Sequence, residues 1–464
     1  MKKTAYAPVL LLALLAACEV GPDYQKPATD AAVAYKESND WNPAQPMDAI
    51  DRGQWWTVYQ DPILNALEKQ VDVSNENLKS FEAAYRAAKA SADQTRAGLF
   101  PTVALGKSAT RTGTGTHTAA NAYDLSADAS WTVDLWGKIR REVENAESTA
   151  QASAADLANA RLSAQAELAT DYFALRVQDE QQRLLDETVK DDQKILTIVQ
   201  NQYKSGVAAQ SDMLSAQATL ESAQSQAAAS RLKRDQLEHA IAVLVGQQPA
   251  DFALPPAPTL DRVPLIPAGL PSQLLERRPD IASAERQMAA ANADIGVAEA
   301  AYYPSLTLSA SYGFSASMAN QLFNAASTLW SFGASASETA IDFGARDAAT
   351  EEARATFDQS LATYRQTVLT AFQNVEDNLA AQHFLIAQEK AQKAAARDAD
   401  KAEQITVNQY KQGVASYESV LNAQIQRLTD DQAALTVTGD RLSASVALIE
   451  ALGGGWDASQ LPKM

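Results

Sequence analysis

Cysteine and histidine are nearly absent from this chain of 464 residues. The single cysteine, Cys18, has no second cysteine with which to form a disulfide within the chain. The three histidines, His117, His239 and His383, are widely separated along the sequence, so they predict no His/Cys metal cluster. The composition therefore argues against zinc sites and thiol redox chemistry.

Residues that form turns are also scarce. Glycine occurs 19 times and proline 17 times, whereas ordinary usage is about 7% glycine and about 5% proline. Alanine is instead the commonest residue and glutamine is frequent, and both favour helices. This composition disfavours an all-β fold and predicts long helices joined by few turns.

Positive charge is in the minority. The chain has 39 Lys and Arg residues against 57 Asp and Glu residues, and its net charge is -18. Nucleic-acid binding would need a basic patch to meet the phosphates, and no run rich in Lys or Arg exists to build one. The excess of acidic residues can serve to keep the protein soluble, and this explanation is at least as good as a role in guiding cations.

The N-terminus has the pattern of an export signal. Residues 1–17 contain Lys2 and Lys3, then an apolar run, then small residues. Cys18 follows in LLAAC, which resembles the lipobox of bacterial lipoproteins. The resemblance implies a covalent lipid on Cys18, and Glu19, in place of the Asp that often retains such proteins at the inner membrane, implies sorting to the outer membrane. A lipid anchors a chain to one leaflet but does not span the bilayer.

Proline positions reveal an internal duplication. Eight prolines lie between Pro249 and Pro279, and the spans 102–248 and 305–461 have none. NQYKSGVA, which begins at residue 201, recurs as NQYKQGVA at residue 408, and the same offset of 207 residues relates two further pairs of glycines. We therefore expect two copies of one unit around a proline-rich connector.

Each copy begins with a predicted helix, over about 62–97 and about 272–300, and a predicted β-hairpin follows it. Apolar and polar residues alternate strictly from Tyr123 to Leu135, as in a strand with one apolar face. This alternation recurs after residue 305, and residues 300–337 carry no charge. The hairpins are expected at about 101–135 and about 304–343, with the weak alternating pattern of outer-membrane strands.

Very long helices follow the hairpins, over about residues 138–200 and 345–409. More than 60 helical residues extend roughly 95 Å at about 1.5 Å per residue. Gly206 and Gly413 then suit left-handed helix ends at two tight tips, and a second helix returns from each tip. The fold class is therefore mainly α with membrane β-structure.

Four strands cannot close a barrel, and open strand edges are not tolerated in lipid. The chain must therefore oligomerise if its hairpins enter a membrane. A trimer would supply about twelve strands, well above the minimum of about eight. The alanine-rich helices would then form a tube that continues the barrel.

The motifs of the chain resemble those of the outer membrane factors, the TolC-like family, and in particular its OprM/NodT lipoprotein branch. They are CEVGPDYQKP after the lipobox, FPTV and DLWG beside the first hairpin, LLERRPDI at 274–281, YPSL at 303, the paired tips and ALGGGW at 451. The resemblance covers nearly the whole mature chain. It implies a homotrimer with four strands per protomer in a shared β-barrel, an α-helical periplasmic barrel and a mixed equatorial domain.

The resemblance also implies partners and sites. An outer-membrane channel of this kind exports small molecules together with a periplasmic adaptor (membrane fusion protein) and an inner-membrane pump of the resistance-nodulation-division (RND) class. The adaptor would contact the tips at Gly206, Val207, Gly413 and Val414. The periplasmic aperture, which relatives often line with a large apolar residue and an Asp, would here be lined by Glu418 and Asn422, with Asp212 nearby.

The resulting division assigns 1–17 to the signal, 18–60 and 454–464 to equatorial segments, 61–246 and 272–453 to the repeats, and 247–271 to the connector. The tips are expected at about 204–211 and 411–418.

No catalytic or metal site is expected, since ALGKSAT at 104 has Pro101 where a phosphate loop needs its first Gly. Two alternatives stay open: the channel of a type I protein exporter and a lipid-anchored periplasmic coiled-coil adaptor.

Overall fold

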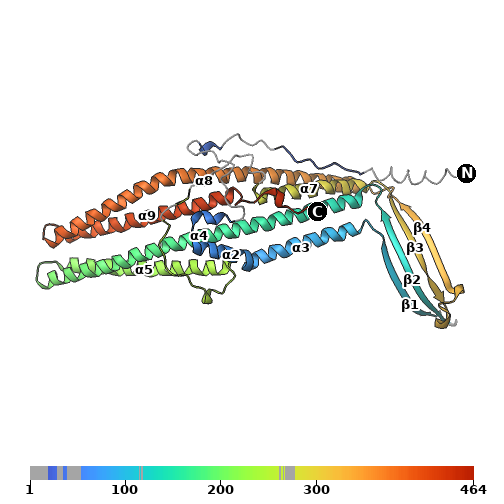
Figure 1. Cartoon of the computed structure of the whole chain (residues 1–464), viewed down its shortest axis with the longest axis horizontal. Helices are drawn as coiled ribbons and strands as arrows, with labels where there is room; N and C mark the ends of the chain where they lie inside the picture. Colours follow the sequence, from blue (N-terminus) through green and yellow to red (C-terminus); the bar gives the residue numbers. More distant parts are fainter. Residues whose placement is uncertain are drawn as a thin grey trace.

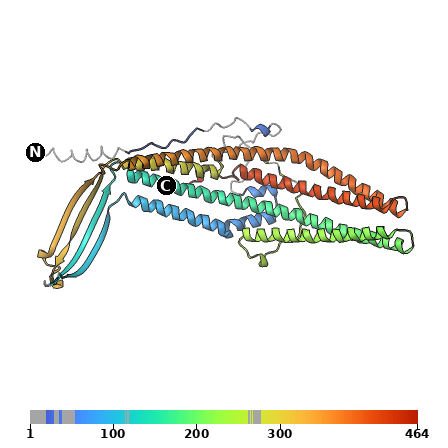
Figure 2. The same cartoon turned by 180° about the vertical axis from the view of Figure 1, so that it is seen from behind.

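A computed structural model describes residues 19–28, 35–38, 54–113, 115, 119–260, 263–264, 266 and 277–463. The expected signal peptide, Cys18 and part of the connector lie outside these residues. The molecule is elongated, with long helices running side by side, a β-sheet at one end and two helical tips at the other (Figures 1 and 2). None of the described helices is long and apolar enough to cross a membrane.

The two hairpins form one antiparallel sheet in the order β1-β2-β3-β4. The central pairing joins the two repeats, with Trp131 opposite Leu308 and Tyr123 opposite Ala316. This sheet confirms the four strands expected per protomer and leaves β1 and β4 as open edges. The strands are β1 (Thr102–Thr112), β2 (Ala120–Val133), β3 (Ser305–Ala316) and β4 (Thr328–Ser337).

The last strand is shorter than the alternation predicts. We expected it to continue to about Phe343, but β4 ends at Ser337. Ser337 pairs with Ser305, the first residue of β3, so the strand has no partner beyond this point. Asp342 instead caps the next helix, and its carboxylate accepts a hydrogen bond from the Gly344 amide at 3.1 Å.

The expected very long helices are present. The helices α4 and α8 contain 67 residues each, and each follows a glycine with positive φ, Gly137 or Gly344. Their returning partners α5 and α9 contain 35 residues each. The bounds are α4 (Lys138–Lys204), α5 (Gln210–Leu244), α8 (Ala345–Lys411) and α9 (Tyr417–Ala451).

The opening helices differ from the expectation in detail. The stretch 62–97 was expected as one helix, but it divides into α2 (Pro62–Ser74) and α3 (Glu76–Ala97). Asn75 causes the break because its side chain accepts from the Leu78 amide at 3.1 Å and donates to the Leu244 carbonyl at 2.9 Å. In the second repeat one helix was expected from about 272, but the backbone of Arg278 is extended and α7 (Pro279–Ala300) begins only after it, with Pro279 as its first residue.

The helices pack as one curved layer. Near the tips the neighbours run in the order α5, α4, α9, α8, and near the sheet they run α3, α4, α7, α8. The main apolar core lies midway along the molecule, where Trp55, Trp56 and Tyr59 pack against Tyr172 and Phe173 of α4. The layer therefore has a free flank on α5 and α3 at one side and on α8 at the other.

Candidate functional site

Both tips have the same backbone geometry. Gly206 and Gly413 adopt φ angles of 76° and 75°, a left-handed conformation that glycine allows without strain. The next amide in each tip closes the turn: Val207 donates to the Gln202 carbonyl at 2.8 Å, and Val414 donates to the Gln409 carbonyl at 2.9 Å. The sequence repeat is therefore also a structural repeat.

The tips present their apolar residues to solvent. Val207 is 77% exposed and Val414 is 75% exposed. Apart from each glycine and its chain neighbours, no atom of the described residues lies within 4 Å of the position that a β-carbon would take on Gly206 or Gly413. The surface of each tip is therefore open, and nothing in the described chain covers it.

A small apolar cluster holds the two tips side by side. Val199 of α4, Leu220 of α5 and Val420 of α9 are among its buried members. The hydroxyl of Tyr410 donates to the Gln202 side chain, and the rings of Tyr410 and Tyr417 lie 6.1 Å apart. The apolar cluster and the Tyr410–Gln202 hydrogen bond join the end of one helical hairpin to the end of the other, whereas Tyr410 and Tyr417 both belong to the second hairpin.

The three expected aperture residues are divided between two environments. Glu418 and Asn422 are exposed and lie one helical turn apart on the same face of α9. Asp212 is half-buried in the first turn of α5, where its negative charge adds to burial in raising the pKa of Tyr410 and Tyr417. The structure therefore places Glu418 and Asn422 together on the exposed face of α9, whereas Asp212 lies on α5 and is half-buried.

A polar contact between the hairpins was missed in the sequence. Asp192 of α4 is only 4% exposed, and the Gln424 amide of α9 donates to its Oδ1 at 3.1 Å. Burial raises the pKa of Asp192 to about 6. Asp192 precedes the buried Ile195 and Leu196 by three and four residues, and this helical spacing was the available signal.

Asp192 and Gln424 also line an open groove of about 390 Å³ between α5 and α9. Close by, the Arg427 guanidinium pairs with Glu403 of α8 at 2.5 Å. Polar groups therefore link α4 to α9 and α9 to α8 in the tip half of the molecule. Among the described residues, no group of acidic, histidine or cysteine side chains has the arrangement of a metal site.

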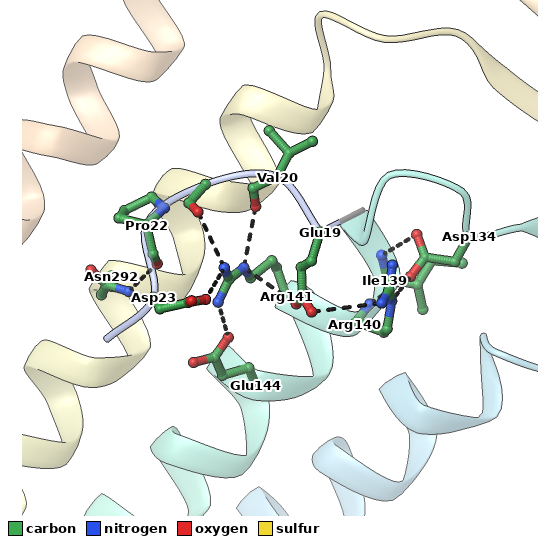
Figure 3. Close-up of polar contacts among 11 residues, drawn as sticks. Glu19, Val20, Pro22, Asp23, Asp134, Ile139, Arg140, Arg141, Glu144 and Asn292 are labelled. Carbon is green, nitrogen blue, oxygen red and sulfur yellow. Dashed lines mark hydrogen bonds and ion pairs between the residues drawn. The ribbon is translucent and has the colours of Figure 1, made fainter. Parts of the chain in front are cut away.

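At the opposite end, residues 19–23 are held against the junction of sheet and helices (Figure 3). The Val20 amide donates to the Trp136 carbonyl at 3.1 Å, and Asn292 donates to the Pro22 carbonyl at 2.8 Å. A β-carbon on Gly21 would lie 2.4 Å from the Gly296 backbone of α7. This close backbone approach requires glycine.

Arg141 is the centre of this N-terminal clamp (Figure 3). Its side chain is 3% exposed and donates to the Asp23 carboxylate at 2.9 Å and the Glu144 carboxylate at 2.7 Å. It also donates to the carbonyls of Val20 and Gly21, each at 3.3 Å. The buried guanidinium is thereby well partnered, and it fixes the segment that begins at Glu19.

Comparisons with known proteins agree with this geometry. Residues 67–247 and 270–454 match the family described as "Outer membrane efflux protein". The probable efflux pump outer membrane protein TtgC of Pseudomonas putida is 30% identical over 98% of this chain and 96% of the relative. The toluene efflux pump outer membrane protein TtgI of Pseudomonas putida is 30% identical over 98% of each chain. The solved outer-membrane channel OprN superposes with a TM-score of 0.87 at 30% identity, over 95% of this chain and 100% of that chain.

Proposed function

Because the chain belongs to the outer membrane efflux protein family and is the outer-membrane channel of a tripartite efflux pump, we propose that it works as a passive homotrimeric conduit for small molecules. An inner-membrane pump of the RND class would supply the energy, and a periplasmic adaptor would join the two. The relative named for toluene efflux supports a small-molecule cargo. The single observation that carries the trimer is that both the sheet and the helical layer end in open flanks.

The two faces of the sheet suit the wall of a membrane barrel. Along the central pairing, Leu125 lies opposite Phe314 and Ala127 lies opposite Tyr312, whereas Ser126 lies opposite Gly313. One face is therefore apolar and aromatic, and the other carries small polar residues. Outer-membrane barrels place such faces toward lipid and lumen respectively.

The free flanks of the helical layer are apolar where a neighbour would pack. Leu214 and Leu232 on α5 are 55% and 60% exposed, and Leu369 and Phe384 on α8 are 63% and 65% exposed. Exposed apolar side chains on opposite flanks favour a ring in which α8 of one protomer meets α5 of the next.

The tips are the proposed adaptor contact. We expect Val414→Asp to leave trimers and conductance unchanged, because Val414 is 75% exposed and loses no internal packing. Adaptor binding should fall at least roughly tenfold, since an unpaired carboxylate would be buried in the interface. Pull-down of the adaptor and drug-susceptibility assays measure this. Val73→Asp, at a residue 74% exposed on α2, is the matched control, and full adaptor binding by Val414→Asp would contradict the proposal.

Glu418 and Asn422 are proposed to face the channel axis at the aperture. Three copies of the Glu418 carboxylate would then repel one another and attract cations. In planar bilayers, Glu418→Ala should lower the preference of the channel for cations over anions, because it removes three negative charges from the aperture. The exposed Glu352 of α8 provides the control, Glu352→Ala. Unchanged conductance and an unchanged preference for cations in Glu418→Ala would refute the assignment.

A lipid on Cys18 is proposed to anchor each protomer beside its strands. The support is the N-terminal clamp, which holds Glu19 through Arg140 at 3.6 Å and Arg141 at 3.3 Å at the junction of sheet and helices. An acyl chain attached one residue earlier would enter the bilayer next to the sheet. Intact-mass measurement should show the lipid mass on the wild-type chain and not on Cys18→Ser, and an unmodified wild-type Cys18 would disprove it.

A further inference from the structure

Charge is segregated between the two faces of the sheet. The four strands contain four charged residues: Lys107 and Arg111 on β1, and Asp124 and Asp128 on β2. Asp124 pairs with Ser108 and lies on the polar face, whereas Lys107 pairs with Leu125 and lies on the apolar face with Arg111. Both cations therefore face the side assigned to lipid, and both anions face the lumen.

Neither cation has a counterion among the residues that the structure describes. Both side chains belong to exposed residues of β1, and within the described chain neither has a hydrogen bond or ion pair. The carboxylates of Asp124 and Asp128 are instead engaged by Ser108, Ser126 and Ser311 across the other face. The sheet itself thus separates Lys107 and Arg111 from the nearest acids.

The height of Arg111 points to the outer leaflet, whereas the backbone of Lys107 lies near the middle of the membrane band. Thr102 begins β1 at the helical end, and Thr112 ends it at the loop end. A rise of about 3.4 Å per residue and a tilt of about 40° put Arg111 roughly 23 Å above Thr102, near the top of an apolar band about 25 Å tall. Lys107 lies roughly 13 Å above Thr102 by the same spacing, and its long side chain can extend toward the outer headgroups.

A cation on the lipid face is costly at the bilayer centre and is tolerated near the interface. Two cations without any anion on this face therefore suggest an anionic partner in the membrane. Phosphate suits this role because a guanidinium binds it through paired, charge-assisted hydrogen bonds. The outer leaflet of an outer membrane is built largely from phosphorylated glycolipid. We therefore take this glycolipid as the source of the phosphate.

We infer that Lys107 and Arg111 form a binding site for the phosphate groups of lipid A, the phosphorylated glycolipid of the outer leaflet. This inference rests on the proposed function, because it requires the sheet to span the outer membrane. Since β1 is an edge strand, the site lies at the seam where a neighbouring protomer's β4 would pair. There the exposed Trp330 and Phe332 of β4 offer an apolar wall for acyl chains.

Native mass spectrometry of the purified trimer tests the site. Lipid A with both phosphates, dephosphorylated lipid A and phosphatidylglycerol are each added to the detergent-solubilised protein at equal concentration. We expect the wild type to retain the phosphorylated lipid A at least about tenfold better than either other lipid, as one additional charge-assisted hydrogen bond would provide. The double variant Lys107→Gln/Arg111→Gln should lose this preference.

The control variant Arg86→Gln/Lys89→Gln removes the same charge from exposed residues of α3 and should keep the preference. Equal retention of phosphorylated and dephosphorylated lipid A by the wild type, equal retention of phosphatidylglycerol, or an unaffected double variant would each overturn the inference. Conductance in phosphatidylcholine bilayers separates this result from the proposed function. Wild type and double variant should both conduct there, and a wild type that does not conduct would refute the channel itself.

Discussion

Replacing Gly453 by alanine is expected to lower the free energy of unfolding by about 2–5 kcal/mol and to reduce the yield of folded trimer. Gly453 has a φ of 90°, and a β-carbon at this position would lie 2.0 Å from the Arg277 carbonyl oxygen. The left-handed conformation costs a residue with a side chain about 1–2 kcal/mol, and overpacking against backbone adds about 1–3 kcal/mol. The two contributions together are about 2–5 kcal/mol. This loss is a substantial part of the roughly 5–15 kcal/mol by which a typical folded protein is stabilised.

The yield of heat-stable trimer in the outer-membrane fraction and thermal unfolding by circular dichroism measure this effect. Gly206→Ala is the matched control, because Gly206 has a similar φ of 76° but open space around its β-carbon position. It should lose only the conformational cost of about 1–2 kcal/mol. A Gly453→Ala chain as stable as Gly206→Ala would contradict the close approach. The repeat predicts the same behaviour at Gly246, where a β-carbon would lie 2.3 Å from the Ser74 carbonyl oxygen.

The second large effect is expected at the flank of the helical layer, where Phe384→Asp should convert trimers to monomers. Phe384 of α8 is 65% exposed in the single chain, so the substitution loses little packing within the protomer. In the proposed ring it would bury a carboxylate in each of three apolar interfaces, and an unpaired polar group costs about 1–3 kcal/mol at least. Size-exclusion chromatography with light scattering in detergent should show monomers.

Ile425→Asp is the control for this experiment. Ile425 is 53% exposed, but α9 already has α4 and α8 as neighbours on its two sides, so its exposed face does not lie on a flank. Ile425→Asp should therefore remain trimeric. If Phe384→Asp also remains trimeric, α8 does not form the contact between protomers.

The elements that the sequence predicted well are those set by local patterns. Strict alternation located β2, and the offset of 207 residues related the two tips, because strand and helix periodicity is written in consecutive residues. The break at Asn75 was missed because no glycine or proline marks it. It depends on a cap and on a hydrogen bond to Leu244, which lies 169 residues away.

The N-terminal clamp and the Asp192 contact were missed for a related reason. Arg141 contacts Asp23 across 118 residues, and Gln424 contacts Asp192 across 232 residues. No local pattern encodes such pairs: Asp23 lies outside any helix, and helical spacing can place Asp192 on the buried face without identifying Gln424 as its partner. Asp212 was grouped with Glu418 at the aperture because relatives of the chain have their aperture there. Whether these two side chains meet depends on how three copies of the chain are arranged around a common axis.

The equal lengths of the two helical hairpins restrict how the chain can change. Because α4 and α8 each have 67 residues and α5 and α9 each have 35, the two tips end at the same depth below the sheet. The six tips of a trimer would then lie in one plane, so a partner protein could contact all six at once. A deletion of two turns in one hairpin would shorten it by roughly 11 Å and leave alternate tips out of reach. Changes that adapt this protein to a wider or narrower periplasm must therefore occur in all four helices together.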